Sequence, residues 1–413
     1  MSTVLAYTSP ARGHLFPLTP ILDELRARGH HITLRTLASE VPRMRERGFD
    51  AAPIAAGVEA IELRDWQAGG TQKALAASVG TFVARAEHDA ADLRRAIAEQ
   101  QPDIVLVDVN SWGASAVAQQ WGGPWAVFCP YPLALRSQQA PPFGPGLPPA
   151  RGPLGRMRDR ALRPLIHAAL QRQMLPGLNG LRADLGLPAL SSIDEQFLLP
   201  PLLVYLTAEP FEYHRDDWPA NVVMVGPCEW EPESQAPAWL DEVDRPIVLV
   251  TTSSEFQNDG RIVQVALEAL ADEPVHVVAT LPADQAELVA APPNAHVARF
   301  VAHGPVLDRA VCAVTHGGMG ATQKALSRGV PVCAVPHGRD QLEVARRVVV
   351  AGAGTRLPKR KLTPQRLREQ VRAAMTMQAG AQRVREGFRR AGGAQAAANA
   401  VEQRLLTNTA ASG

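Results

Sequence analysis

A glycine-rich turn in the second half of the chain carries residue types that bind anions. The segment 316–320, of sequence HGGMG, follows the apolar run 311–315 and precedes a helical pattern over 321–327. Glycines let a backbone approach a ligand closely, and the N-terminus of the next helix offers free N–H groups and a favourable dipole. Thr322 and His316 add a hydroxyl and a ring donor. A diphosphate is the natural occupant of such a turn, although a tight strand-to-helix turn in any α/β protein is the alternative.

A histidine and an aspartate in the first part of the chain could form an acid–base pair. His14 follows an apolar run at 4–7 and a glycine, and Asp108 ends a second apolar run at 104–107. If the two runs are neighbouring strands of one sheet, the two side chains can meet at its edge. A carboxylate that holds one ring nitrogen fixes the tautomer and stabilises the imidazolium. The pair can then take a proton from an attacking hydroxyl, whereas a histidine that only satisfies a turn is the alternative.

Alternating strands and helices must position these residues. The first half opens with a strand at 4–7, a helix at 15–28 and a strand at 32–36, and the second half repeats this order from a strand at 247–251. This order predicts doubly wound sheets, whose ligands bind at the carboxyl ends of the strands. The other predicted strands are 104–107, 125–129, 202–206, 221–225, 275–280, 297–300, 311–315 and 330–335, and the other helices include 71–101, 112–121, 156–185, 261–271, 321–327, 363–377 and 381–407.

Three segments in the second half together resemble a known family. The order HGG-x-G-x-T at 316–322, GVP at 329–331 and P-x-x-x-DQ at 336–341 closely resembles the donor-nucleotide motif of the inverting family 1 glycosyltransferases. These include plant UDP-glycosyltransferases and the macrolide and antibiotic glycosyltransferases of actinomycetes, and the resemblance runs over nearly the whole chain. It implies the GT-B fold, an α/β architecture of two doubly wound Rossmann-like domains that face each other across a cleft. With 413 residues the chain is long enough for two domains.

The resemblance and the composition together predict the domain boundaries. Residues 1–226 are expected to form an N-terminal acceptor-binding domain, and residues 246–385 a C-terminal nucleotide-sugar-binding domain. Residues 227–245 are expected to link them, because the stretch CEWEPESQAP is polar and rich in proline. In this family the last helix returns to the N-terminal domain, so residues 386–413 are expected to cross back.

Two short segments assign the catalytic pair by resemblance. The segment GHLFP at 13–17 resembles the family's G-H-x-x-P segment, whose histidine is the catalytic base, and VLVD at 105–108 matches the family's orienting aspartate. The resemblance therefore implies that His14 is the base and that Asp108 orients it. Gly13, which precedes the base, is assigned to the nucleotide-sugar site.

The resemblance also assigns residues to the nucleotide sugar. Ser253 and Ser254 occupy the place of the family's Gly-Ser and would contact phosphate or ribose. Phe300, Val301 and His303 correspond to the family's W-V-P-Q segment and would hold the base, with the Phe300 ring stacked on it. The diphosphate is assigned to His316, Gly317, Gly318, Met319, Gly320 and Thr322, and the sugar hydroxyls to Asp340 and Gln341.

One position departs from the family pattern and bears on the donor. Plant members carry a ribose-binding glutamate eight residues after the diphosphate-binding histidine, where this chain has Lys324. The departure argues against strict UDP selectivity. The sequence shows no metal-ligand spacing, and GT-B enzymes of this type work without a metal, so we expect no metal and no cofactor beyond the nucleotide sugar as co-substrate.

The composition bounds the partners and the surroundings of the protein. The formal net charge is +1, with 46% hydrophobic and 20% charged residues, so bulk charge indicates no nucleic-acid partner. No apolar stretch has membrane-spanning length, and a cytoplasmic protein is expected. The Pro- and Gly-rich stretch 130–153 predicts a mobile surface loop that shapes the acceptor pocket. In the basic helical stretch 156–185 a solvated face is favoured over a membrane-surface role.

These observations predict an inverting glycosyltransferase that moves a sugar from a UDP- or dTDP-sugar to a small hydrophobic acceptor. A polyketide, a macrolide or a phenolic natural product would fit as acceptor. Two alternatives on the same fold are a nucleotide-sugar epimerase, which would need no acceptor pocket, and a non-catalytic nucleotide-binding partner protein, which would not need His14 and Asp108. A Rossmann dehydrogenase is disfavoured because no G-x-G-x-x-G follows the first strand. The sequence leaves the sugar, the acceptor and the glycosylated atom open, and a homodimer is a possible assembly.

Overall fold

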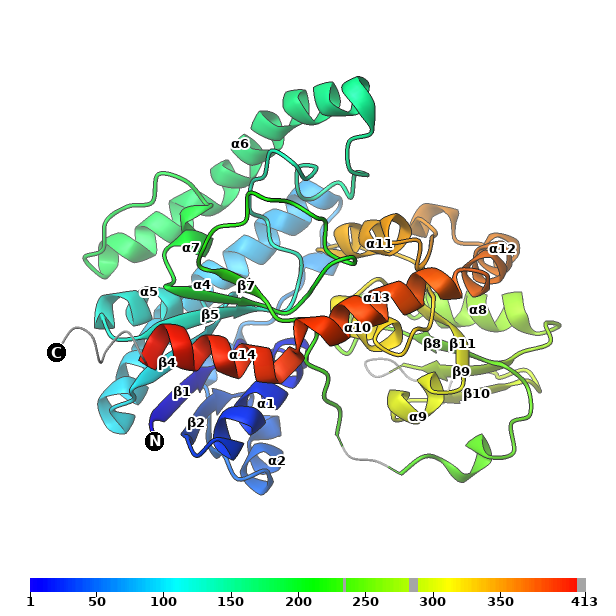
Figure 1. The fold of residues 1–413 in the computed structure, drawn as a ribbon, viewed down its shortest axis with the longest axis horizontal. Helices are drawn as coiled ribbons and strands as arrows, with labels where there is room; N and C mark the ends of the chain where they lie inside the picture. Colours follow the sequence, from blue (N-terminus) through cyan, green and yellow to red (C-terminus); the bar gives the residue numbers. More distant parts are fainter. Residues whose placement is uncertain (233–234, 282–288, 407–413) are drawn as a thin grey trace.

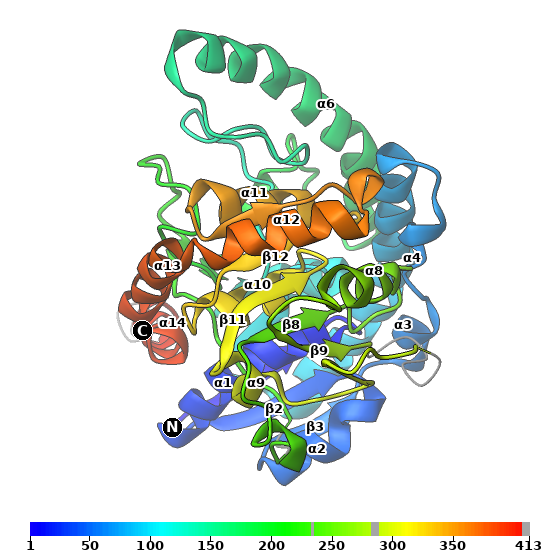
Figure 2. The same cartoon turned by 90° about the vertical axis from the view of Figure 1, so that its right-hand side faces the viewer.

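The chain forms two α/β domains, which lie beside each other in Figures 1 and 2. The computed structural model describes residues 1–232, 235–281 and 289–406. The first domain has a seven-stranded sheet of order β3-β2-β1-β4-β5-β6-β7, and the second a six-stranded sheet of order β10-β9-β8-β11-β12-β13. All pairings in both sheets are parallel. The predicted fold class, with two doubly wound Rossmann-like domains, is confirmed.

The central strands of the first domain are short apolar runs that are buried along most of their length. Such runs are typical of parallel sheets, because crossover helices cover both sides. The strands are β1 (Thr3–Tyr7), β2 (His31–Thr36), β3 (Asp50–Pro53), β4 (Ile104–Asp108), β5 (Trp125–Cys129), β6 (Leu202–Tyr205) and β7 (Val222–Met224). The helices are α1 (Arg12–Ala27), α2 (Val41–Glu46), α3 (Ala56–Ala60), α4 (Thr71–Gln100), α5 (Trp112–Trp121), α6 (Gly152–Asp184) and α7 (Glu195–Leu198).

The second domain repeats this construction on a smaller scale. Its strands are β8 (Ile247–Thr251), β9 (His276–Thr280), β10 (Ala295–Ala298), β11 (Ala310–Thr315), β12 (Val332–Ala334) and β13 (Gly354–Arg356). Its helices are α8 (Arg261–Leu270), α9 (His303–Leu307), α10 (Met319–Leu326), α11 (Gln341–Val350), α12 (Pro364–Met375) and α13 (Gln378–Ala391). Within the described part of 227–245, the one regular element is a single turn of 3-10 helix at Ala238–Leu240.

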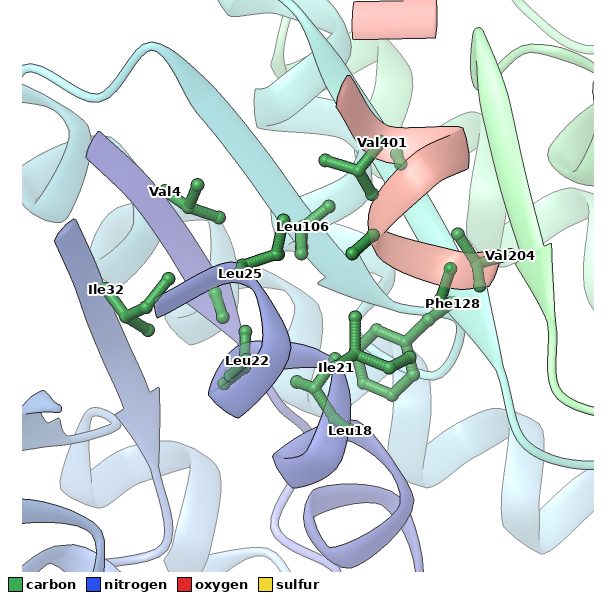
Figure 3. Close-up of a cluster of buried hydrophobic side chains, with 14 of the residues drawn as sticks. Val4, Leu18, Ile21, Leu22, Leu25, Ile32, Leu106, Phe128, Val204 and Val401 are labelled. Carbon is green, nitrogen blue, oxygen red and sulfur yellow. The ribbon is translucent and has the colours of Figure 1, made fainter. Parts of the chain in front are cut away.

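The C-terminal helix packs on the first domain. The chain turns at Gly392 (φ 89°) into α14 (Gly393–Val401), which lies against α1 and the sheet of the first domain (Figure 1). Figure 3 shows Val401 among the core side chains of that domain, including Leu25 and Leu106. The turn comes later than the predicted boundary at 386, which falls inside α13. The predicted end of the last helix at 407 lies outside the described residues.

Several predicted segments differ from the structure, most of them only at their ends. The helix predicted from 381 is interrupted at Gly392, between α13 and α14. The strand predicted at 297–300 is β10 and ends two residues earlier, at Ala298. The helical stretch predicted from 156 begins at Gly152 and forms the single long helix α6, which projects from the first domain in Figure 1. The stretch 130–151 has no helix or strand, as predicted, but it is packed and not a free surface loop. The peptide N–H groups of Gly144 and Gly146 both donate to Glu343 Oε1 of the second domain, at 2.8 Å.

Candidate active site

The parallel register brings His14 and Asp108 together. Tyr7 of β1 lies opposite Val107 of β4, so the loops after both strands leave the sheet at the same edge. The turn after β1 feeds directly into α1, whose first turn carries His14. His14 Nδ1 lies 2.8 Å from Asp108 Oδ1, and the aspartate is completely buried. The two residues predicted as base and orienting partner therefore form a hydrogen-bonded pair.

The surroundings of Asp108 keep it ionised beside the imidazole. Its Oδ2 accepts hydrogen bonds from the Ser9 backbone N–H at 3.0 Å and the Ser9 hydroxyl at 2.7 Å. Burial alone would raise the pKa of Asp108, but the charge and hydrogen bond of His14 and these donors lower it. Burial alone would lower the pKa of His14, but the charge and hydrogen bond of Asp108, together with the charges of Glu255 and Asp340, raise that pKa above the usual value. The pair thus stabilises an imidazolium once it forms.

Two residues that the sequence motifs do not predict lie at the second nitrogen of His14. Asn110 Nδ2 is 3.3 Å from His14 Nε2, and the Tyr131 hydroxyl donates to Asn110 Oδ1 at 2.8 Å. The Tyr131 ring also packs against the imidazole, with centroids 5.7 Å apart. Both residues follow the carboxyl ends of neighbouring strands, β4 and β5. Their position at this sheet edge is the one sequence signal that could have indicated them.

The predicted diphosphate turn has the close packing that its glycines suggest. Gly317 has φ 83°, and a Cβ at position 318 would overlap Nε2 of His316. The His316 ring is buried at the carboxyl end of β11, and burial and the charge of Arg339 lower its pKa to about 4. His316 is therefore neutral near pH 7, with one ring N–H available for donation. The turn ends at Met319, the first residue of α10, and Gly320 is exposed on its first turn.

Two buried polar atoms in this region have no hydrogen-bond partner among the described residues. They are His316 Nδ1 and Thr322 Oγ1, and the side chain of Thr322 is completely buried. Buried polar groups are nearly always satisfied. Asp259 Oδ2 lies 3.8 Å from His316 Nδ1, beyond hydrogen-bonding distance. Free hydrogen-bonding capacity next to a helix N-terminus fits an anionic ligand.

The two serines of the turn after β8 differ in burial. Ser253 is buried: its N–H donates to Asp259 Oδ2 at 2.8 Å, and its hydroxyl accepts from Gln257 Nε2 at 2.8 Å. Ser254 is exposed. Of the two predicted ligands, Ser253 holds the turn together, whereas Ser254 is free to face a ligand.

The segment predicted to hold the base begins with an exposed aromatic ring. Phe300 is 54% exposed, so it is not part of the core, whereas Val301 is buried in the second domain. His303 begins α9, and its Nε2 lies 3.1 Å from the Thr280 hydroxyl. Burial and the charge of Lys324 lower the pKa of His303 to about 4.

Lys324 itself is paired with an acid from outside the domain. Its Nζ donates to Glu231 Oε2 at 3.0 Å, and Glu231 also accepts from the backbone N–H groups of His303 and Gly304. The chain segment between the domains therefore supplies a carboxylate next to the predicted base-binding segment.

The pair predicted for the sugar lies at the start of α11. Gln341 is buried: its Oε1 accepts from the N–H groups of His337 at 2.7 Å and Gly338 at 3.0 Å, and its Nε2 donates to Gln257 Oε1 at 2.7 Å. Gln341 thus shapes the loop 337–338. Burial raises the pKa of Asp340, whose charge in turn raises the pKa of His14. The acid–base pair of the first domain and Asp340 of the second therefore lie within electrostatic reach.

The two domains contact each other around this region. Arg339 pairs with Asp65 of the first domain, at 2.8 and 3.0 Å, and with Glu255 at 3.1 Å. The rings of Trp66 and Phe256 meet edge to face, 4.9 Å apart. Gly13 is exposed in the first turn of α1, beside His14. The site thus lies between the carboxyl edges of the two sheets.

The residues of the structure at 1–232, 235–281 and 289–406 can be assessed for metal ligands and for membrane-spanning helices. In these ranges no group of three or more His, Cys, Asp or Glu side chains could hold a metal ion. None of the helices in the same ranges is long and apolar enough to cross a membrane.

Comparisons with known proteins agree with this fold and indicate the family. Residues 264–402 match the family described as Erythromycin biosynthesis protein CIII-like, C-terminal domain. The chain is 32% identical over 385 residues to 4'-demethylrebeccamycin synthase of Lentzea aerocolonigenes, covering 90% of this chain and 91% of that protein. The structure of the glycotransferase of kitacinnamycin superposes with a TM-score of 0.75 at 24% identity, over 98% of this chain and 99% of the other. The glycosyltransferase VinC, solved in complex with dTDP, has a TM-score of 0.68 at 21% identity, over 97% and 100%. The chain therefore belongs to the GT-B glycosyltransferases of family 1, the family of the antibiotic glycosyltransferases.

Proposed function

We propose that this glycosyltransferase transfers a sugar, with inversion, from a UDP- or dTDP-sugar to a small hydrophobic acceptor, with His14 as general base. The observation that carries the proposal is the His14–Asp108 pair, at 2.8 Å, at the carboxyl edge of the first sheet and within electrostatic reach of Asp340 of the other domain. A carboxylate-held imidazole at such an edge is suited to deprotonate a nucleophile. VinC was solved with dTDP, which keeps dTDP-sugars beside UDP-sugars as candidate donors.

The proposed reaction is a single displacement at the anomeric carbon. The acceptor's proton moves to Nε2 of His14 as its oxygen or nitrogen bonds to the anomeric carbon, while the bond from that carbon to the diphosphate oxygen breaks. Asp108 stabilises the imidazolium. The negative charge on the leaving diphosphate meets the His316 ring, the N–H groups at the start of α10 and the Thr322 hydroxyl, which are fixed before the reaction. Attack opposite the leaving group inverts the configuration, and the donor set supplies the stabilisation without a metal.

A donor and acceptor panel with product analysis tests this proposal. UDP- and dTDP-sugars of α configuration are incubated with aromatic polyketide, macrolide and phenolic acceptors, with and without a chelator. The expected product is a β-glycoside, identified by the NMR coupling of its anomeric proton, at a rate that the chelator does not change. An α-glycoside would overturn inversion, and an epimerised donor without glycoside would overturn transfer.

A further inference from the structure

The free nitrogen of His14 is not open in the structure. Asn110 Nδ2 lies 3.3 Å from His14 Nε2, the nitrogen opposite the one that Asp108 holds. Because Nδ1 carries the proton shared with Asp108, Nε2 is the acceptor, and the amide of Asn110 is its donor. The 3.3 Å separation is at the long end of the hydrogen-bond range, so an acceptor hydroxyl can displace it.

The Asn110 amide is held by both its backbone and its side chain. Its backbone N–H donates to Asp108 Oδ1 at 2.9 Å, and its side-chain oxygen accepts from the Tyr131 hydroxyl at 2.8 Å. Burial raises the pKa of Tyr131 well above the usual value, so the hydroxyl keeps its proton. A donating hydroxyl at the amide oxygen turns the amide nitrogen toward the imidazole. Tyr131 thus selects one of the two orientations that an asparagine side chain can take.

The charged groups around His14 favour its protonated form, so the orientation of the Asn110 amide affects whether the ring can act as a base. Asp108 contacts the ring directly, and the charges of Glu255 and Asp340 in the other domain act on it from a greater distance. Arg339 offsets part of the Glu255 charge through an ion pair at 3.1 Å. All three carboxylates favour the imidazolium, and an imidazolium cannot act as a base. A donor at Nε2 acts in the opposite direction, because it bonds to the neutral ring and not to the protonated one.

We propose that Asn110 is a positioning residue that donates to Nε2 of His14 and keeps this nitrogen unprotonated until the acceptor takes its place, in an orientation fixed by the hydroxyl of Tyr131. This role rests on the proposed function of His14 as the general base. The acceptor's hydroxyl or N–H replaces the amide as the donor to Nε2, and the same proton then moves to the ring. Above the pKa of His14, Nε2 therefore passes from one hydrogen-bond donor to the next without first taking up a proton.

Histidine titration in the substrate-free protein tests the proposal without reference to activity. The ring of His14 is assigned in isotope-labelled protein by the signal missing from His14→Gln. Asn110→Asp replaces the donor with an anion at the same place. The titration midpoint of His14 in this variant should rise by about one to two pH units. Asn110→Ala and Tyr131→Phe remove the donor or its orientation, and each should raise the midpoint by less. In the double variant Asn110→Ala/Tyr131→Phe, the His14 midpoint should be the same as in Asn110→Ala alone.

Control variants separate this effect from general damage. Asn399→Asp adds the same charge on the exposed face of α14, where Asn399 accepts from Arg28, and should leave the His14 midpoint unchanged. Far-UV circular dichroism and thermal melting establish that each variant is folded. If Asn110→Asp destabilises the fold too far for titration, the His14 midpoint in Tyr131→Phe, which keeps the ring packing, tests the proposal instead.

Enzyme kinetics connect the titration to the reaction. The acid limb of kcat/KM should move to higher pH by the same amount as the midpoint in each variant. An unchanged His14 midpoint in both Asn110→Asp and Tyr131→Phe would overturn the proposal. So would a Tyr131→Phe change that shifts the His14 midpoint equally in the wild-type protein and in Asn110→Ala. Failure of the proposed function has a different signature: midpoints that shift as described, with glycoside formation that does not depend on His14.

Discussion

Arg339 of the second domain grips Asp65 of the first domain through two hydrogen bonds, Nη2 to Oδ1 at 2.8 Å and Nε to Oδ2 at 3.0 Å. Arg339 adopts φ 51°, a left-handed conformation that is uncommon for a residue with a side chain. It directly precedes Asp340, and its charge contributes to the low pKa of His316. One arginine therefore links the contact between the two domains with the predicted diphosphate turn.

The ion pair between Asp65 and Arg339 should hold the domains closed. Asp65→Ala leaves Arg339 with Glu255 alone, so the domains should separate further and the radius of gyration from X-ray scattering should increase. The free energy of unfolding should fall by about 1–3 kcal/mol, less than for a fully buried pair because the Arg339 side chain is 22% exposed. Asp23→Ala is the control, because Asp23 pairs with Arg47 inside one domain. Scattering curves of Asp65→Ala that superpose on wild type would rule out this role.

The packing of the loop 130–151 should depend on one glycine. Gly146 has φ 61°, and a Cβ there would overlap the carbonyl oxygen of Leu342. Gly146→Ala should detach the loop from Glu343 and lower the free energy of unfolding by about 1–3 kcal/mol. Urea unfolding measures the loss, and amide hydrogen exchange should show reduced protection at 144–146. Gly180→Ala in α6, where a Cβ meets nothing within 4 Å, should be neutral or slightly stabilising. Equal effects of the two substitutions would contradict the docked loop.

The diphosphate turn should be sensitive to a methyl group at one position. Gly318→Ala forces the His316 ring to move, because the added carbon overlaps Nε2. Calorimetric titration with UDP and dTDP should show at least about tenfold weaker binding, the equivalent of one charge-assisted hydrogen bond. Gly320→Ala, one position into α10, meets nothing within 4 Å and should weaken binding less. If Gly320→Ala weakened nucleotide binding more than Gly318→Ala, the result would argue against His316 as a phosphate ligand.

Two buried histidines should make the fold sensitive to mild acid. The pKa values of His316 and His303 lie at about 4 in the folded protein, against 6.5 for an ordinary histidine. The unfolded chain therefore binds more protons between these values, so stability falls as the pH drops from about 6.5 to about 4. Each histidine contributes up to about 3 kcal/mol across this window.

Urea unfolding of wild type and His303→Gln at about pH 7 and about pH 5 measures this contribution. Glutamine cannot titrate, so His303→Gln should lose less stability on acidification than wild type. His31→Gln is the matched control, because His31 is exposed at the start of β2. The prediction fails if His303→Gln and wild type lose stability in parallel.

The sequence predicts those parts of the site that depend on local pattern. The strands β1 and β4 are apolar runs, and a parallel sheet aligns their carboxyl ends, so the meeting of His14 and Asp108 could be expected. The turn 316–320 could be expected as well, because its glycines, histidine and following helix are contiguous in the chain. In each case, every functional residue is close in sequence to the strand or helix that positions it.

Contacts between distant segments could not be predicted in this way. The loop 130–151 is packed because Glu343, about two hundred residues later, accepts from two of its N–H groups. Asn110 and Tyr131 belong to no motif, and only the fold brings their side chains to His14. Gln341 matches a family position, but its hydrogen bonds to the loop 337–338 and to Gln257 appear only in three dimensions.

The assignment of His14 as the general base is tested by the rate of glycoside formation in His14→Ala, measured together with the affinity for the donor nucleotide. We predict a loss of about 10²- to 10⁴-fold in kcat with an unchanged nucleotide dissociation constant, because the hydrogen-bond partners of the His14 ring among the described residues are Asp108 and Asn110 and not the predicted diphosphate turn. A kcat within a few-fold of wild type, at full donor affinity, would contradict the assignment of His14 as the general base.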